Sequence, residues 1–418
     1  MRRPGRCAVL LYGSGWKIIS VWSAWSKIII LSGKINCSLD KKVIIALNAA
    51  WNLVNFRANL IRGLAAAGYE VVAIAPPDEY APRLAELGCR YVPLSMDNKG
   101  THPGRDLLLF WRFLQLLRKE KPAVYLGYTV KPNIYGSLAA HLLGVPVINN
   151  IAGLGAVFIQ EGWLTRLVQR LYRVALSRSA KVFFQNNVDR ALFVSKNLVS
   201  DVVTDRLPGS GIDLNRFVPV PLPDKTPLRF LLIARMLWDK GVGEFVEAAR
   251  ILKKQGVNAE FCLLGFLDVQ NPTAISRQQM DEWIAEGVIR YLGVSDNVAE
   301  EIALADCVVL PSYREGIPRT LLEAAAMARP IVAADAVGCR DVVDDSINGY
   351  LCRPRDATDL ADKISRIVAL SCIERTAMGL HGREKMEREF DERIVIDKYL
   401  RAIEEILNRP EPSPSGQS

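Results

Sequence analysis

The stretch LPSYREGIPRTLLEAAAM, residues 310–327, is the part of the sequence from which the fold class is most readily predicted. The apolar run CVVLPS (307–312) is typical of a buried strand that ends at a proline. Pro318 suits the start of a helix, and residues 319–327 carry a helical pattern. A strand, a tight loop and a helix N-terminus therefore meet at Glu315 and Gly316. Such a junction favours a diphosphate, because free N–H groups and the helix dipole point toward it.

Two glutamates bracket this junction. Glu315 lies just before the predicted helix and Glu323 lies two turns inside it. At ~1.5 Å of rise per residue, eight residues span roughly 12 Å. Carboxylates at that separation can accept hydrogen bonds from hydroxyls at the two ends of a nucleotide-sugar, with the phosphates between them. The alternative is an ordinary strand-to-helix connection with two solvated acids.

The composition indicates a globular chain of two ordinary domains. The chain has 418 residues, of which 50% are hydrophobic and 23% are charged. Its 8 cysteines are scattered without a CxxC pair, which predicts reduced thiols rather than a disulfide framework or a zinc site. With 3 histidines, a histidine-built metal centre is not expected. No uncharged apolar run reaches the length of a membrane span.

Positive charge is concentrated in the first half of the chain. Residues 1–39 hold 6 basic and no acidic side chains, and residues 40–222 hold 22 basic against 13 acidic. Residues 223–385 hold 20 basic against 24 acidic. A basic first domain predicts an anionic partner, either lipid headgroups or a diphosphate-bearing acceptor. Nucleic acid is not expected, because no interleaved basic and aromatic motif is present.

The first half reads as repeated strand–helix–strand units. Strands are predicted at 43–47 and 71–76 with one helix between them, and no GxGxxG fingerprint follows the first strand. Asn55 and Arg57 lie near the carboxyl end of the strand predicted at 43–47. Each could contact an acceptor substrate or occupy an ordinary surface position. Residues 124–158 form a second unit, in which Thr129 and Lys131 follow a strand on a TVKP loop. Lys131 is either a phosphate contact or a structural surface cation.

A glycine-bearing loop is predicted after the next strand of this unit. It would contain Asn149, Gly153 and Gly155, whose glycines let backbone amides approach a ligand. In the second half, Arg235 and Lys240 follow the strand predicted at 228–235, and Gly241 opens a helix. Two cations beside a helix N-terminus predict a diphosphate clamp.

These motifs together resemble family 4 of the retaining glycosyltransferases. The E-x7-E spacing, with glycine after the first glutamate, resembles the donor motif of that family. The segments ARMLWDKGVGEFVEAA (234–249) and DAVGCRDVV (335–343) are similar to bacterial members that extend lipid-linked oligosaccharides, among them N-acetylgalactosaminyltransferases acting on undecaprenyl-diphospho-bacillosamine. The resemblance covers roughly residues 40–408. It departs from the subgroup at Asp341, which replaces a glutamate.

The resemblance implies an α/β protein of the GT-B fold, with two Rossmann-like, doubly wound domains facing a central cleft. The acceptor-binding domain is expected at 40–217, a linker at 218–228 and the donor-binding domain at 229–385. A helix at 386–408 is expected to cross back to the first domain, followed by a disordered tail at 409–418. Residues 1–39 are a basic, apolar extension, which is either a membrane-surface segment or lies outside the folded enzyme.

The implied activity is retaining glycosyl transfer, which needs no metal or cofactor. The sugar, an N-acetylhexosamine or a hexose, would move from a nucleoside diphosphate, expected to be UDP, to a polyprenyl-diphosphate-linked saccharide during lipopolysaccharide or exopolysaccharide assembly. The implied catalytic residues are Arg235, Lys240 and Glu315. The donor would also contact Glu323, Gly316 and Ile317, and the acceptor would contact Lys131, Thr129, Asn149, Gly153 and Gly155.

Two other functions remain open, namely a nucleotide-sugar epimerase and a catalytically silent nucleotide-sugar-binding scaffold at the membrane. The expected location is the cytoplasmic face of the plasma membrane, with peripheral attachment. A helix predicted at 163–178 carries four arginines, which either contact anionic lipid or form a solvated face of a core-packed helix.

Overall fold

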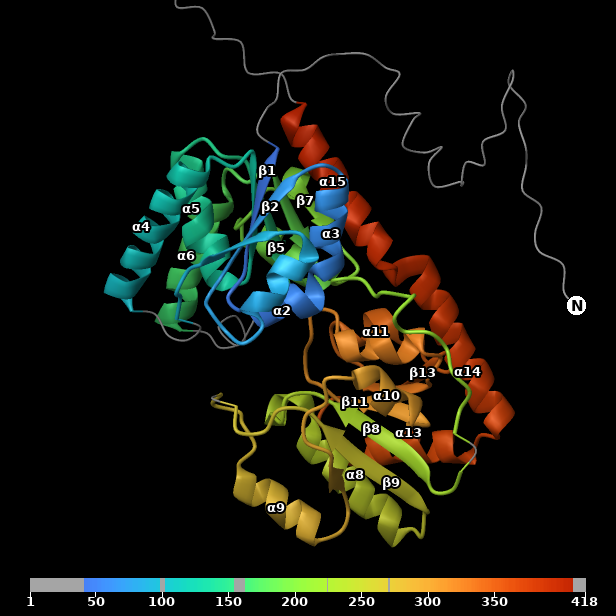
Figure 1. Cartoon of the computed structure of the whole chain (residues 1–418). Helices are drawn as coiled ribbons and strands as arrows, with labels where there is room; N and C mark the ends of the chain where they lie inside the picture. The colour runs from blue at the N-terminus through green and yellow to red at the C-terminus, as the bar shows by residue number, and fades with distance from the viewer. Residues whose placement is uncertain (1–40, 98–101, 154–161, 224, 270, 409–418) are drawn as a thin grey trace, which may run out of the picture. The chain divides into compact units, whose positions relative to one another are not determined.

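The computed structural model describes residues 41–97, 102–153, 162–223, 225–269 and 271–408. These residues form two lobes, each built on a parallel β-sheet (Figure 1). The first sheet has 7 strands in the order β3-β2-β1-β4-β5-β6-β7. Its strands are β1 (Lys42–Ala46), β2 (Glu70–Ala75), β3 (Arg90–Pro93), β4 (Val124–Tyr128), β5 (Val147–Ile151), β6 (Lys181–Phe184) and β7 (Thr204–Arg206).

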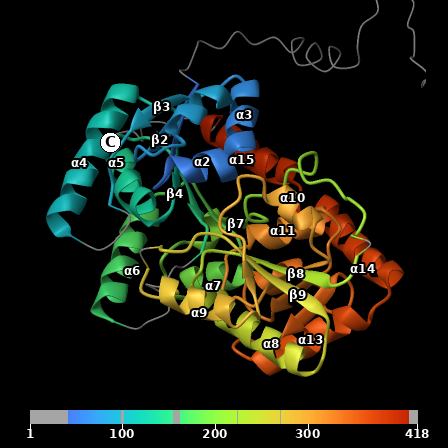
Figure 2. The same cartoon turned by 60° about the horizontal axis from the view of Figure 1, so that its bottom comes forward.

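Helices cover both faces of the first sheet, which explains the apolar runs of its central strands β1, β2 and β4. Val43 and Ile45 of β1 pack on one side with helices α2, α3 and α15, and Ile44 packs on the other with α4 and α5. Figure 2 shows the same layers from a second direction. The helices of this lobe are α2 (Ala50–Phe56), α3 (Ala58–Ala66), α4 (Pro103–Glu120), α5 (Ser137–Leu142), α6 (Trp163–Leu176) and α7 (Asn187–Ser195), with shorter turns at Ala81–Leu87, Pro132–Gly136 and Asp201–Val203.

The second sheet has 6 strands in the order β10-β9-β8-β11-β12-β13. They are β8 (Leu228–Ile233), β9 (Ala259–Leu264), β10 (Arg290–Tyr291), β11 (Cys307–Leu310), β12 (Ile331–Ala334) and β13 (Gly349–Cys352). Phe230 and Leu232 pack toward α8 and α13, while Leu231 packs toward α11. The helices are α8 (Val242–Lys254), α9 (Arg277–Ala285), α10 (Val298–Ala303), α11 (Arg319–Ala326), α12 (Cys339–Val342), α13 (Ala357–Ala369) and α14 (Cys372–Lys385), with turns at Trp238–Lys240 and Met386–Phe390.

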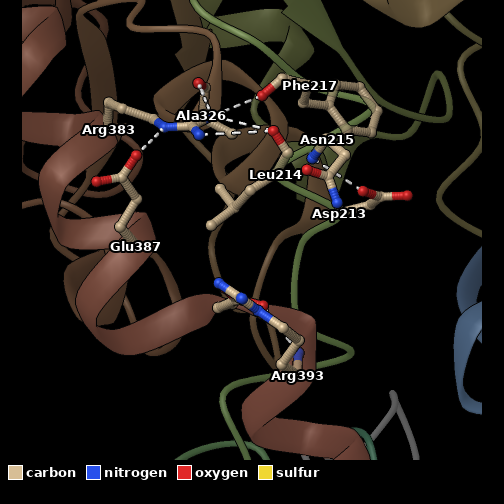
Figure 3. Close-up of polar contacts among 9 residues, drawn as sticks. Asp213, Leu214, Asn215, Phe217, Ala326, Arg383, Glu387 and Arg393 are labelled. Atoms are coloured by element: carbon tan, nitrogen blue, oxygen red, sulfur yellow. Dashed lines mark hydrogen bonds and ion pairs between the residues drawn. The ribbon is translucent and has the colours of Figure 1, made fainter. Parts of the chain in front are cut away.

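Two arginines, the half-buried Arg383 and the buried Arg329, fix the connecting segment to the second lobe. Arg383 of α14 donates to the backbone carbonyls of Leu214, Phe217 and Ala326 at 3.5, 2.8 and 3.0 Å (Figure 3). Arg329, which is fully buried, donates to the carbonyls of Val220, Pro221, Ile302 and Ala303, and also to that of Met327. Charged donors satisfy these carbonyls, so residues 214–221 are held as part of the second lobe.

The last helix, α15 (Glu392–Leu407), packs against α3 of the first lobe. Val395 and Tyr399 are buried in the same core as β1, and the Tyr399 hydroxyl accepts a 2.9 Å hydrogen bond from the Asn150 amide. Just before this helix, Ile212 and Asp391 form a parallel bridge. The two segments through which the chain passes between the lobes are therefore hydrogen-bonded to each other.

The predicted α/β class with two doubly wound sheets is confirmed, and two local expectations are corrected. The single helix expected after the first strand is divided at Arg57 into α2 and α3. Lys131 lies in a helical turn rather than on a loop. The predictions for residues 1–39 and 409–418 fall outside the described residues.

Candidate active site

The loops that follow β8 and β11 are joined to each other. The Tyr313 amide donates to the Asp239 carbonyl at 3.0 Å. Gly241 has a φ of +73°, and a Cβ there would lie 2.2 Å from the Pro311 carbonyl oxygen, so only glycine allows this approach. As a result, Lys240 and Glu315 form an ion pair with 2.5 Å between Nζ and Oε1. Two of the predicted catalytic residues are therefore in contact.

Arg235 follows β8 by two residues and is exposed. Its side chain forms no ion pair or hydrogen bond with any residue that the structure describes. It shares the 235–241 loop with Lys240, so the predicted pair of cations lies on one connection. Of these two cations, Arg235 is the one that forms no ion pair with a carboxylate among the described residues.

Glu323 lies inside α11, and its carboxylate is paired within the same helix. Arg319 donates to Oε1 at 2.8 Å, one turn earlier. Burial raises the pKa of Glu323, and the charge of Arg319 opposes that rise. Glu323, which is predicted to contact the donor, is thus held in place by an arginine at the start of the helix.

The loop between β11 and α11 contacts the first lobe. The Ile317 amide donates to Gln185 Oε1 at 3.2 Å, and Asn186 Nδ2 donates to the Gly316 carbonyl at 3.3 Å. A Cβ on Gly316 would lie 2.0 Å from the Ala152 carbonyl oxygen, so this close approach also requires glycine. The two amides predicted to face the donor therefore lie against the ends of β5 and β6.

An ion pair between the partly exposed Arg314 and the buried Asp189 strengthens this contact. Asp189 is fully buried at the start of α7; burial raises its pKa, and the positive charge of Arg314 opposes the rise. The sequence analysis did not identify Gln185, Asn186, Asp189 or Arg314. The N-cap pattern Asn186-x-x-Asp189 marks the helix start, but nothing in the sequence indicates that Arg314 reaches it.

The predicted acceptor residues are placed differently from one another. Lys131 pairs with Asp106 of α4 at 2.8 Å, and both side chains are nearly buried. Thr129 has a φ of +60°, and its hydroxyl donates to the Tyr128 carbonyl at 2.6 Å. Gly153 lies beside Gly316, whose backbone nitrogen would be 3.7 Å from a Cβ at this position. Gly155 is outside the described residues.

Asn149 does not lie on a ligand-binding loop, as was expected, but within β5. Its side chain is fully buried, donates to Asn133 Oδ1 at 2.9 Å and to Ser137 Oγ at 2.8 Å, and accepts from Ser179 Oγ at 2.6 Å. Every polar atom of the amide is used inside the lobe. The expected loop placement of Asn149 is therefore wrong, and its side chain joins β5 to its neighbours.

Two further features of the described residues bear on membrane crossing and on the state of the cysteines. Over those residues, no helix has both the length and the apolar character that a membrane crossing requires. The cysteines in the same ranges are free thiols, and all but Cys372 are buried.

The fold is shared with solved glycosyltransferase structures. A glycosyltransferase from Rickettsia africae superimposes with a TM-score of 0.73 at 16% identity, covering 89% of this chain and 100% of that one. The Anabaena protein HepE in complex with UDP-glucose gives 0.72 at 15% identity, covering 87% of this chain and 99% of that one. The two facing parallel sheets and these likenesses define a protein of the GT-B fold.

Two family models divide the chain between the lobes. The model for glycosyl transferase 4-like domains matches residues 54–209, and the model for glycosyl transferases group 1 matches residues 227–369. The chain therefore belongs to the family 4 type of glycosyltransferase and is a hexosyltransferase. The predicted family and enzyme class are confirmed.

Two similar proteins have a named activity. The chain is 28% identical to N,N'-diacetylbacillosaminyl-diphospho-undecaprenol alpha-1,3-N-acetylgalactosaminyltransferase of Campylobacter jejuni, over 86% of this chain and 97% of that protein. It is 22% identical to UDP-Gal:alpha-D-GlcNAc-diphosphoundecaprenol alpha-1,3-galactosyltransferase of Escherichia coli, over 68% of this chain and 78% of that protein.

Proposed function

We propose that the protein transfers an N-acetylhexosamine or a hexose from a UDP-sugar to a saccharide carried on a polyprenyl diphosphate, with retention of the anomeric configuration. The observation that carries the proposal is the convergence of Arg235, Lys240 and Glu315 on two joined loops at the sheet edge where such folds bind ligands. The names of the two relatives, both of which act on undecaprenyl-diphosphate-linked sugars, support the acceptor class.

Donor binding exchanges the partners of the charged groups. The side chain of Arg235 is open to solvent, whereas Lys240 is held by Glu315. A donor diphosphate competes with Glu315 for the lysine, and the released carboxylate accepts hydrogen bonds from the donor sugar. Arg235 and Lys240 then neutralise the charge that develops on the departing diphosphate, which is the kind of interaction that stabilises a transition state most.

In this mechanism the acceptor hydroxyl attacks from the face that the diphosphate leaves, and the reaction uses no metal or cofactor. The two cations perform the task that a divalent cation performs in other phosphate chemistry. No side chain is assigned as a covalent nucleophile. Thr129 and Gly153, at the ends of β4 and β5, are proposed to line the acceptor side.

Opening of the site requires a hinge, and the arginine contacts indicate where it bends. Arg383 and Arg329 hold residues 214–221 on the second lobe. The first part of the 218–228 segment is therefore not expected to bend. We place the hinge at residues 209–213 and 390–392, where the two paired crossings lie. Opening there separates the Ile317 amide from Gln185 and leaves it available to the donor.

The protein is proposed to work at an anionic membrane surface, on which the acceptor is held. Helices α4 and α6 both contact α5 and expose apolar side chains, including Trp111, which is 52% exposed, and Trp163, which is 73% exposed. The exposed cations on these two helices are Arg105, Arg112, Arg118, Lys119, Arg166, Arg170 and Arg173, and the exposed Arg178 follows the end of α6. Interfacial tryptophans beside cations favour anionic lipid headgroups.

Product analysis tests this function. Purified protein would be incubated with a panel of UDP-sugars and polyprenyl-diphosphate-linked saccharides, followed by mass spectrometry and determination of the anomeric configuration by NMR. We expect a product longer by one sugar with the configuration of the donor, and no product from the Glu315→Gln variant. Absence of transfer across the panel, or an inverted linkage, would contradict the proposal.

A further inference from the structure

Arg57 is a buried cation at the point where the first helix is divided. Helix α2 ends at Phe56 and α3 begins at Ala58, and the residue between them turns its side chain inward, leaving 5% of its surface exposed. Its guanidinium lies over the Tyr128 ring, 4.6 Å from the centroid, and Nη1 donates to the Phe56 carbonyl at 3.2 Å. No carboxylate in the described part of the chain pairs with it.

Of the other cations in enclosed positions, Arg375 also has a buried Nε without an acceptor among the described residues, but it does not line the pocket that Arg57 lines. Lys131 and Arg329 are neutralised or fully hydrogen-bonded. Lys131 has Asp106 as its partner, and Arg329 donates to a ring of backbone carbonyls. Arg57 has a single carbonyl, and its Nε has no acceptor among the described residues. A buried charge without a counterion is costly, so a site that retains one is suited to an anion from outside.

Two more polar atoms near Arg57 are left without partners. They are the Tyr128 hydroxyl, at the end of β4, and Asn150 Oδ1, at the end of β5. The Asn150 amide nitrogen is already used by Tyr399, whose ring lies 6.1 Å from that of Tyr128. Unpartnered groups from three segments therefore gather at the carboxyl ends of adjacent parallel strands, where doubly wound sheets bind ligands.

Of these three residues, Arg57 lines a pocket that has an excess of positive charge. Arg57 lines the pocket together with Arg62, Arg216 and Arg319, against the two acids Asp213 and Glu392. Both carboxylates accept from the Asn59 amide, at 3.0 and 2.6 Å. Burial raises the pKa of Glu392, and the charge of Asp213 raises it further, which disfavours a second negative charge there.

We propose that Arg57 binds the diphosphate of the polyprenyl acceptor where it lines this pocket. This inference rests on the proposed function, and it moves the acceptor's phosphate contact away from Lys131, which is already paired with Asp106. The Arg57 guanidinium donates to phosphate oxygens from the pocket wall. Tyr128 and Asn150 do not line the pocket and are assigned no contact with the phosphate. Arg319, from the start of α11, brings the second lobe to the same pocket.

The test is a calorimetric titration of geranyl diphosphate into the full chain saturated with UDP, so that the donor cations are already occupied. The variant is Arg57→Met, and the matched control is Arg83→Met, an exposed arginine of the first lobe that does not line the pocket. We expect about tenfold weaker binding by Arg57→Met, and a change below about threefold in the control. The melting temperature of Arg57→Met should be unchanged or higher, because an uncompensated charge is removed.

Several outcomes would overturn the inference. Unchanged geranyl diphosphate binding by Arg57→Met, with a lower melting temperature, would make Arg57 a structural cation only. Loss of wild-type binding upon UDP saturation would place the diphosphate in the donor site. If Arg57→Met does not fold, Arg57→Lys, which keeps the charge but loses the Nε donor, should show an intermediate affinity, and wild-type affinity would contradict us. Failure of the proposed function is separate, because it appears as absence of transfer by the wild-type protein.

Discussion

The two lobes share one architecture, yet they hold their charged groups in different ways. In the second lobe, Lys240 and Glu315 meet on loops at the ends of β8 and β11. In the first lobe, Lys131 and Asp106 meet between a helical turn and α4, a helix packed on the sheet. Loop charges at a sheet edge can exchange partners when a ligand arrives. Charges fixed on packed helices cannot do so without leaving a buried ion unpaired.

This difference separates cations that serve the ligand from cations that serve the fold. Arg235 in the second lobe and Arg57 in the first have no carboxylate partner among the described residues. Arg235 is exposed on the 235–241 loop, and Arg57 is buried in the wall of the pocket that it lines. Substituting these cations one at a time should therefore affect either catalysis or stability.

The largest effect is expected for the donor cations. Arg235→Met and Lys240→Met should each lower kcat by about 10²–10³-fold, because each removes a charge that meets the developing negative charge of the diphosphate. Steady-state transfer assays would measure the loss. The melting temperature should change little for Arg235→Met, since this exposed side chain contacts no described partner. A rate within a factor of two or so of wild type would remove Arg235 from the site.

Lys131→Met should mainly reduce stability. Asp106 would remain buried without its cation, which costs about 3 kcal/mol, whereas the transfer rate per folded molecule should stay close to that of wild type. Urea unfolding and acceptor KM would be measured together. The exposed Lys196→Met is a control expected to stay within about 0.5 kcal/mol. A higher acceptor KM with intact stability would instead show that Lys131 contacts the acceptor.

Arg383→Met tests the connector and should cost about 2 kcal/mol. The carbonyls of Leu214, Phe217 and Ala326 would lose a charged donor in a half-buried position. Denaturant unfolding would measure the change. The control is Arg388→Met, an exposed arginine that pairs with the adjacent Glu389. Equal losses in the two variants would mean that the connector is not fixed by Arg383.

The smallest effect concerns Glu392. Its pKa is raised in the folded state by burial, so the folded protein binds more protons than the unfolded chain between the unfolded and folded pKa values. Stability therefore falls as pH rises through this window. Glu392→Gln should gain stability relative to wild type as pH increases from 4 to 7, and should match it at lower pH. A gain that does not depend on pH would contradict the assignment.

Much of the fold follows from local patterns. The final helix was expected within residues 386–408 and is observed at Glu392–Leu407, because its apolar period and the Asp391 cap are both visible in the sequence. The strands around Glu315 are similarly marked by continuous apolar runs. Such elements are set by burial on one or two faces, which a periodic pattern records.

The side-chain partners could not be predicted in the same way. The pairs Lys131–Asp106 and Arg314–Asp189 join residues far apart in the chain, and only the packed structure decides which charges meet. Asn149 was expected in the same loop as Gly153, yet buried hydrogen bonds hold it inside a strand. Arg57 was considered only as a possible contact, since its lack of a counterion is a tertiary property.

The central claim is that the Lys240–Glu315 pair marks the donor site. It is tested most directly by comparing the rate of labelled sugar transfer by Glu315→Gln with that of Glu286→Gln, a carboxylate of the same lobe that pairs with Arg250 at the surface. Our account predicts a loss of about 10²-fold or more for Glu315→Gln and almost none for Glu286→Gln. Equal rates for the two variants would contradict it.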